Sequence, residues 1–146
     1  MRTYLFDYLK SVSTPIFLYG MGNGADKIIE QCEKRNIKIE GIFASDEFVR
    51  GQTFHGMTVQ SYSQVRSKHS DIIILLCFGS SLPDVLDRIY ALANQNELYA
   101  VATNYSGFEL DTEITINNGY KVKKIIRGEI DKIAPFETLI VKLKKN

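Results

Sequence analysis

An apolar segment runs directly into a glycine-rich turn in the stretch Pro15-Ile16-Phe17-Leu18-Tyr19-Gly20-Met21-Gly22-Asn23-Gly24-Ala25. The apolar part is typical of a buried strand. The residues after the turn are typical of a helix, because Ile28, Ile29 and Cys32 share one helical face. A strand, a glycine turn and a helix in this order form the usual cradle for a nucleotide phosphate. The stretch therefore predicts a nucleotide-binding α/β unit.

The spacing within the turn, counted from Gly20, is G-x-G-x-x-A. Gly20 permits the tight turn, Gly22 lets a pyrophosphate approach the backbone, and the small side chain of Ala25 lets the helix pack closely on the strand. The free amides and the positive dipole end of the helix then face an anion. The residues that we expect to contact the cofactor here are Gly20, Met21, Gly22, Asn23 and Gly24.

A second apolar strand is expected over residues 37–44, followed shortly by Asp46. This acid lies about 25 residues after the first glycine, near the position where dinucleotide-binding units carry the carboxylate that binds a ribose hydroxyl. We therefore predict Asp46 as a ribose ligand. The alternative interpretation is a loop acid with no role in binding.

Further strands are expected over residues 57–60, 71–78 and 98–102, and helical patterns lie between the strands. This alternation favours a Rossmann-like doubly wound parallel sheet with the strand order 3-2-1-4-5. Ligands of such sheets bind at the carboxyl ends of the strands beside the switch point, here strands one and four. Gly79 and Ser80 follow strand four, so they join the predicted cofactor site.

The pattern changes after residue 102. Alternation over 113–116 and 120–126, around the turn signal Asn118-Gly119, predicts a β-hairpin. A last strand is expected over 138–143. We therefore predict a leading helix in 1–14, a nucleotide-binding domain in 15–102 and an antiparallel β extension in 103–146.

The C-terminal segment is locally basic: from residue 120 onward it holds eight Lys or Arg and three Asp or Glu. Lysines of this kind commonly protect an exposed sheet edge. The alternative is a docking surface for an acidic partner.

The composition is that of one ordinary globular domain, with 146 residues, 45% hydrophobic residues and a formal net charge of +1. This charge gives no reason to expect nucleic acid or an acidic membrane as a partner. We find neither a membrane-spanning stretch nor a signal peptide, so a cytoplasmic location is expected. Cys32 and Cys77 fall at core positions, where buried reduced thiols are expected, and the spacing of Cys and His predicts no metal site.

Three segments together resemble known families: Leu18-Tyr19-Gly20-Met21-Gly22-Asn23-Gly24-Ala25-Asp26-Lys27, Gly41-Ile42-Phe43-Ala44-Ser45-Asp46 and Gly51-Gln52-Thr53-Phe54-His55-Gly56-Met57-Thr58-Val59. They look like the Rossmann-like domain found ahead of FkbM-type methyltransferase domains. They are also similar to the nucleotide-binding N-terminal domain of bacterial sugar O-acyltransferases.

The resemblance covers roughly residues 15–102. In both families this domain accompanies a catalytic domain that modifies sugars or related metabolites. The resemblance therefore implies an accessory nucleotide-binding module with a catalytic partner domain. No methyltransferase domain and no hexapeptide repeat follows in this sequence, so the families' catalytic chemistry is not carried over.

The expected cofactor is NAD or NADP, with S-adenosylmethionine and a nucleotide sugar as alternatives. A small methyltransferase is a second interpretation, although its pattern normally places an acid where this chain has Leu18. A dehydrogenase would need an acid or a base beside its cofactor. His55, in a loop that we expect beside the crevice, is a candidate for this role. The alternative interpretation of His55 is a surface residue without a catalytic role. A third interpretation is a ligand-free interaction domain whose glycines serve only the turn. No catalytic residue is assigned, and a homodimer remains open.

Overall fold

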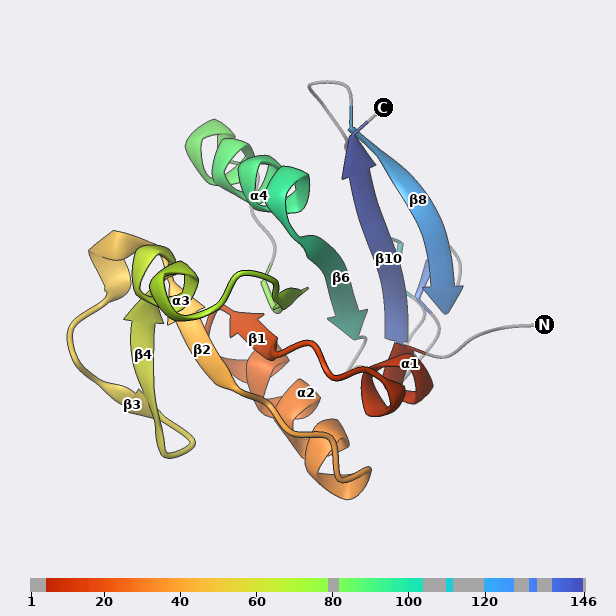
Figure 1. Ribbon diagram of the computed structural model, residues 1–146. Helices are drawn as coiled ribbons and strands as arrows, with labels where there is room; N and C mark the ends of the chain where they lie inside the picture. The colour runs from red at the N-terminus through yellow and green to blue at the C-terminus, as the bar shows by residue number, and fades with distance from the viewer. Residues whose placement is uncertain are drawn as a thin grey trace.

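The computed structural model describes residues 5–78, 82–103, 110–111, 120–127, 132–133 and 138–145, with side chains described for 6–22, 24–78 and 82–99. Within these ranges the chain is an α/β fold, in which helices cover a mixed, mostly parallel sheet (Figure 1). The helices are α1 (Leu5–Ser11), α2 (Asn23–Lys34), α3 (Tyr62–Lys68) and α4 (Pro83–Gln95), with a short 3-10 helix η1 (Asp46–Phe48). The strands are β1 (Ile16–Tyr19), β2 (Gly41–Ala44), β3 (Thr53–Phe54), β4 (Met57–Ser61), β5 (Ile73–Leu76), β6 (Glu97–Thr103), β7 (Leu110–Asp111), β8 (Tyr120–Arg127), β9 (Lys132–Ile133) and β10 (Thr138–Lys145).

The main sheet has the order β3-β4-β2-β1-β5-β6-β10-β8. Strands β4, β2, β1, β5 and β6 are parallel to one another, so these five follow the predicted order. The antiparallel strands β10 and β8 continue the same sheet beyond β6, and β3 pairs antiparallel with β4 at the other edge. The predicted strand over 113–116 and the turn Asn118-Gly119 lie outside the described residues.

Alternate side chains of β1 build two cores, one on each face of the sheet. Ile16 and Leu18 join the core that α1 and α2 cover. Phe17 and Tyr19 join the core that α3 and α4 cover. Both faces of the sheet are packed, so the central strands are continuously apolar. These continuous apolar runs are the signal from which the strands were predicted.

Two segments differ from the sequence prediction. The strand expected over 37–44 begins only at Gly41, because the amide of Ile37 still donates to the carbonyl of Cys32 as the chain leaves α2. Residues 45–56, for which no helix or strand was predicted, contain η1 and β3, and β3 forms a hairpin with β4 through a turn at His55 and Gly56. Short polar segments of this kind carry no hydrophobic periodicity that would have identified them.

Candidate functional site

Gly20 follows β1 directly and has a φ of 109°. Its amide donates to the carbonyl of Phe43 on β2 at 3.0 Å. A Cβ at this position would lie 2.5 Å from Cδ1 of Phe78, which follows β5. Glycine is therefore required at Gly20 for two reasons, the backbone conformation and the aromatic ring that packs over it.

Gly22 caps the N-terminus of α2, with φ 113° and ψ −159°, a conformation that essentially only glycine adopts. No described atom lies within 4 Å of the place where its Cβ would be, and no side chain caps the helix. The first helical hydrogen bond runs from the amide of Asp26 to the carbonyl of Gly22. The amides of residues 23–25 precede this hydrogen bond, so they have no partner within the helix itself.

Gly24 lies in the first turn of α2 against the end of β5. A Cβ there would come closer than 3.0 Å to the carbonyl oxygen of Cys77. Ala25 is fully buried in the core below α2. The close packing of helix on strand, predicted for Ala25 alone, is thus a joint property of Gly24 and Ala25.

Strand register brings three segments to one edge of the sheet. Tyr19 pairs with Phe43 on β2 and with Leu76 on β5, so β1, β2 and β5 end at the same level. Asp46 begins η1 just past β2 and is exposed at this edge, which we name the carboxyl edge. Met21 is partly buried against the core under α2. Gly79 and Ser80 lie outside the described residues.

Three aromatic side chains pack together at the carboxyl edge, on the face of the sheet that α3 and α4 cover. The ring of Tyr19 stacks on that of Phe43 at 4.7 Å between centroids, and it meets the ring of Phe78 edge-on at 5.0 Å. The hydroxyl of Tyr19 lies 2.7 Å from Oγ of Ser45. These contacts fix the start of η1 relative to the glycine turn. The apolar runs of the sequence placed the three rings in strands but did not indicate this cluster.

A second contact holds η1 to α4. The guanidinium of Arg88 donates to Oε1 of Glu47 at 2.7 Å, and this hydrogen bond lowers the pKa of the Glu47 carboxyl below its usual value. The two residues are 41 positions apart in the chain, so no local pattern signals their pairing. Phe48 and Leu82 expose 54% and 63% of their surface respectively.

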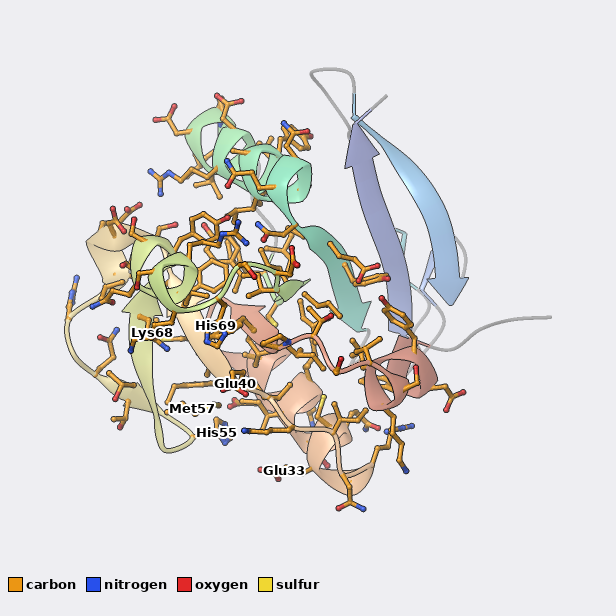
Figure 2. All side chains as sticks on the ribbon, viewed as in Figure 1. Glu33, Glu40, His55, Met57, Lys68 and His69 are labelled. Carbon is orange, nitrogen blue, oxygen red and sulfur yellow. The ribbon has the colours of Figure 1, made fainter. Side chains whose placement is uncertain are left out.

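His55 contacts the first turn of α2, the helix that begins at the glycine turn. It occupies the turn before β4 (Figure 2) and has a φ of 51°. Its Nε2 lies 2.6 Å from Oδ1 of Asp26 on α2. Because β4 is parallel to β1, the residue before β4 lies toward the amino ends of the strands. The hairpin, which the sequence did not reveal, places His55 beside the flank of α2.

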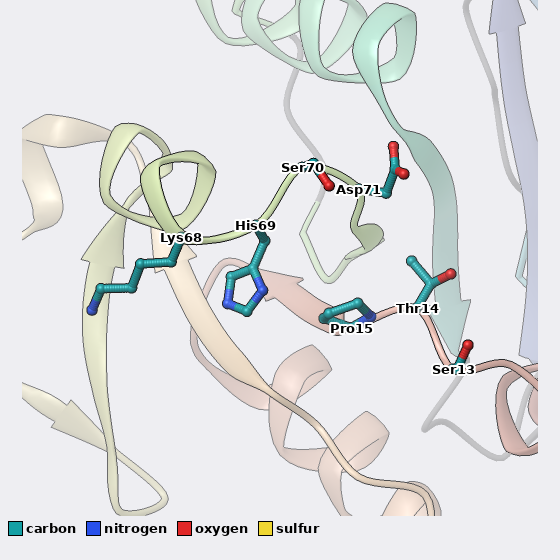
Figure 3. Close-up of a pocket in the computed structure, with 7 residues that line it drawn as sticks. All are labelled: Ser13, Thr14, Pro15, Lys68, His69, Ser70 and Asp71. Atoms are coloured by element: carbon teal, nitrogen blue, oxygen red, sulfur yellow. The ribbon is translucent and has the colours of Figure 1, made fainter.

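Two cavities lie at the opposite, amino edge of the sheet, since Pro15 and Asp71 come shortly before β1 and β5. The first has a volume of about 330 Å³ and is shown in Figure 3; it is lined by Ser13, Thr14, Pro15, Lys68, His69, Ser70 and Asp71. The second, of about 350 Å³, is lined by Thr14, Asp71, Ile72, Ile73, Asn94, Gln95, Asn96 and Glu97. The ring of His69 packs edge-on against Phe17 at 5.2 Å, and the amine of Lys68 extends away from Pro15 (Figure 3). His69 thus lies at the amino edge of the sheet, at the opposite end from the glycine turn.

A tyrosine pair binds one carboxylate near the start of β6. The hydroxyl of Tyr8 on α1 donates to Oε2 of Glu97 at 2.7 Å, and that of Tyr99 donates to Oε1 at 3.1 Å. Burial, and then the hydrogen bond to Glu97, raise the pKa of Tyr8 to about 12. Burial is also the main cause that raises the pKa of Tyr99. The cluster fastens α1 to the sheet, far from the glycine turn in the fold.

Cys32 and Cys77 are buried free thiols, as predicted. No cluster of metal-ligating side chains occurs among the described residues. Nor does this part of the chain contain a helix with the length and apolar character needed to cross a membrane.

No protein-family model matches the chain, and no curated protein sequence matches it.

Proposed function

We propose that the chain is a Rossmann-like nucleotide-binding module that holds the phosphates of NAD or NADP at the glycine turn. We further propose that it serves as an accessory part of an enzyme that modifies sugars or related metabolites. The observation that carries the proposal is the N-terminus of α2 at Gly22, where no atom of the described residues lies within 4 Å of the Cβ position and no side chain caps the helix.

The chemistry of this helix end favours a phosphate. The amides of residues 23–25 have no acceptor within α2 itself, as in the first turn of any α-helix. The positive end of the helix dipole adds about 0.3 to 1 kcal/mol for an anion at an exposed site. Amide hydrogen bonds to a charged oxygen are roughly twice as strong as those between neutral groups. A ligand with two adjacent phosphates therefore gains more here than one with a single carboxylate.

Asp46 supports a ribose next to the phosphates. Its carboxylate is exposed and has no partner among the described residues, so both oxygens are available to hydroxyl groups. It follows β2, which pairs directly with β1, so the acid and the glycine turn share the carboxyl edge. In dinucleotide-binding units an acid at this place accepts from the 2′-hydroxyl of the ribose. That arrangement favours NAD over NADP, whose 2′-phosphate an acid repels.

The first experiment is a thermal-shift panel on the protein with NAD, NADP, S-adenosylmethionine, UDP-glucose and coenzyme A. A ligand that binds only the native state raises stability by about 2.7 kcal/mol at a hundred times its dissociation constant. We expect a shift with NAD and a smaller one with NADP. A shift with S-adenosylmethionine alone would replace the proposal by the methyltransferase interpretation, and no shift with any ligand would overturn it in favour of a ligand-free domain.

Variants then locate the site. Gly22→Val fills the open space but also strains a residue with positive φ, so its stability falls whatever it binds. Gly56→Val is the matched control, because Gly56 has a φ of 78°, also has no described atom within 4 Å of a Cβ, and lies toward the amino edge. The ligand-induced shift should disappear in Gly22→Val and persist in Gly56→Val. Asp46→Asn should reduce the preference for NAD over NADP.

A further inference from the structure

The two cavities at the amino edge of the sheet adjoin each other. Thr14 and Asp71 line both of them, so the cavities form one groove across the entries to β1, β5 and β6, which we name the amino-edge groove. Their volumes of about 330 and 350 Å³ each lie within the range of small-molecule sites, roughly 300 to 1,000 Å³. The glycine turn lies at the opposite edge, so this groove is separate from the proposed nucleotide site.

Parallel pairing assembles the amino-edge groove from three segments of the chain. Residues 13–15 precede β1, residues 68–71 precede β5, and residues 94–97 lead into β6. Because β5 pairs with both β1 and β6, the three segments lie side by side. The amide of Ile73 donates to the carbonyl of Pro15 at 2.9 Å, which fixes the first two segments to each other. The groove is therefore built on the ends of packed strands.

Side-chain hydrogen bonds from α3 fix the segments before β5 and β6 to each other. The hydroxyl of Tyr62 donates to Oε1 of Gln95 at 2.9 Å and accepts from Nδ2 of Asn96 at 2.8 Å. The guanidinium of Arg66 donates to Oδ1 of Asn96 at 3.2 Å and to the carbonyl of Ser70 at 2.5 Å. A lining that is already ordered lowers the entropy cost of binding a ligand.

Several polar side chains of the groove are available to a ligand. Asp71 is exposed, and its carboxylate has no hydrogen bond or ion pair among the described residues. Figure 3 shows this carboxylate pointing toward α4, away from His69. The other lining side chains that lack a hydrogen-bond partner in the described part of the chain include Ser13, Thr14, Ser70 and Asn94. The groove thus presents one free carboxylate among hydroxyl and amide groups.

This lining favours a neutral ligand over a charged one. A metal cation needs several oxygen ligands, and the second carboxylate of the lining, Glu97, is already held by Tyr8 and Tyr99. A phosphate is repelled by the carboxylate of Asp71, and the amine of Lys68 extends away from the groove segment at Pro15 (Figure 3). Hydroxyl groups suit the lining better, because they donate to a carboxylate and accept from an amide.

We propose that the amino-edge groove binds a neutral, polyhydroxylated molecule of about monosaccharide size. The carboxylate of Asp71 accepts hydrogen bonds from neighbouring hydroxyl groups of the ligand. The side-chain amide of Asn94 and the amide nitrogen of Gln95, whose oxygen is held by Tyr62, donate to other ligand oxygens. Hydrogen bonds to a charged oxygen are the strongest of these, so Asp71 contributes most to the affinity.

The test titrates the whole chain with D-glucose, D-galactose, D-mannose, N-acetyl-D-glucosamine and myo-inositol, each to about 50 mM, and follows the backbone amides by NMR. D-glucose 6-phosphate and choline are the charged probes. The test variant is Asp71→Ala, at an exposed position where the core packing is unchanged. The matched control is Asp84→Ala, which removes an exposed carboxylate from the other end of α4.

We expect at least one neutral polyol to shift the amides of residues 70, 71 and 94–96, with a dissociation constant in the millimolar range. A ligand of about a dozen non-hydrogen atoms binds an open groove weakly. Asp71→Ala should bind it about tenfold more weakly, because a hydrogen bond to a charged group is lost. Asp84→Ala should bind it as the unchanged protein does.

Four results would each overturn the proposal. They are no amide shift with any neutral polyol, equal affinity in Asp71→Ala, an equal loss in Asp84→Ala, and tighter binding of a charged probe than of every neutral one. Shifts confined to residues 22–26 would also contradict it, because the polyol would then lie at the glycine turn. None of these results decides the outcome of the nucleotide panel, which concerns the opposite edge of the sheet.

Discussion

Replacing Gly24 by alanine tests how closely α2 packs on the end of β5. Gly24 is helical, so on backbone preference alone the substitution should stabilise the protein by roughly 0.5 to 1 kcal/mol. The structure predicts the opposite sign. The added Cβ would come closer than 3.0 Å to the carbonyl oxygen of Cys77, where ordinary contact begins at 3.4 Å.

The clash involves the backbone on both sides, so no rotation of a side chain relieves it. The helix or the end of β5 must move by at least several tenths of an ångström, and both are packed in the core through Ala25 and Cys77. Overpacking of this kind costs about 1 to 3 kcal/mol. After the gain in helix preference is subtracted, we expect a net loss of roughly 0.5 to 2 kcal/mol, or a thermal midpoint lower by about 2 to 6 °C.

The assay is urea unfolding followed by circular dichroism, with the thermal midpoint as a second readout. Glu33→Ala and Glu33→Gly, at an exposed position of α2, measure the preference of this helix for alanine over glycine. If Gly24→Ala is stabilised by the same amount that separates the two Glu33 variants, the close approach to Cys77 is not real, and the reasoning fails.

Other consequences of the structure are equally direct. Ser61→Ala should lower the free energy of unfolding, measured in urea, by about 0.5 to 2 kcal/mol, because Ser61 and Gln64 form a reciprocal capping box at the start of α3. The control Ser67→Ala, in the same helix, should have little effect. Burial raises the pKa of Cys32 to about 11 and that of Cys77 to about 12. Neither thiol should therefore react with a disulfide reagent at pH 8 until urea unfolds the chain. Fast reaction under native conditions would contradict the buried placement of the two thiols. The pKa of Tyr8 is raised in the folded state from 10.0 to about 12, so its contribution to stability is complete below pH 10 and is lost as the pH rises toward 12. The unfolding free energy of Tyr8→Phe should therefore fall less steeply between pH 10 and pH 12, and parallel curves would show that the hydroxyl is not engaged by Glu97.

Much of the parallel part of the fold was predictable, for a physical reason. Strands packed on both faces are continuously apolar, and helices packed on one face repeat their apolar residues every three to four positions. The runs around Leu18 and Ile74 carry the first signal, and Ile28 with Cys32 carries the second. The glycines of the turn were also visible, because the backbone conformation at Gly20 and Gly22 is a local property.

The candidate site was predictable only in part. Strand order placed Asp46 on the same edge as the glycine turn, and the register agrees with that placement. The contact of His55 with Asp26 was not predicted, because the short hairpin that carries His55 has too few residues to show a period. The pair Glu47 and Arg88 had no signal at all, since its members meet only after the sheet brings η1 and α4 together.

By itself, the sequence determined which segments are buried and where the chain must turn. These properties depend on the chemistry of neighbouring residues. Only the tertiary structure decided that Gly24 meets the carbonyl of Cys77, and that the pairing of β8 with β10 shifts twice. A strand has two faces with a period of two, and its pairing register alone fixes which residues share a face with those of the next strand. That register is set by contacts between residues far apart in the chain, so no local pattern contains it.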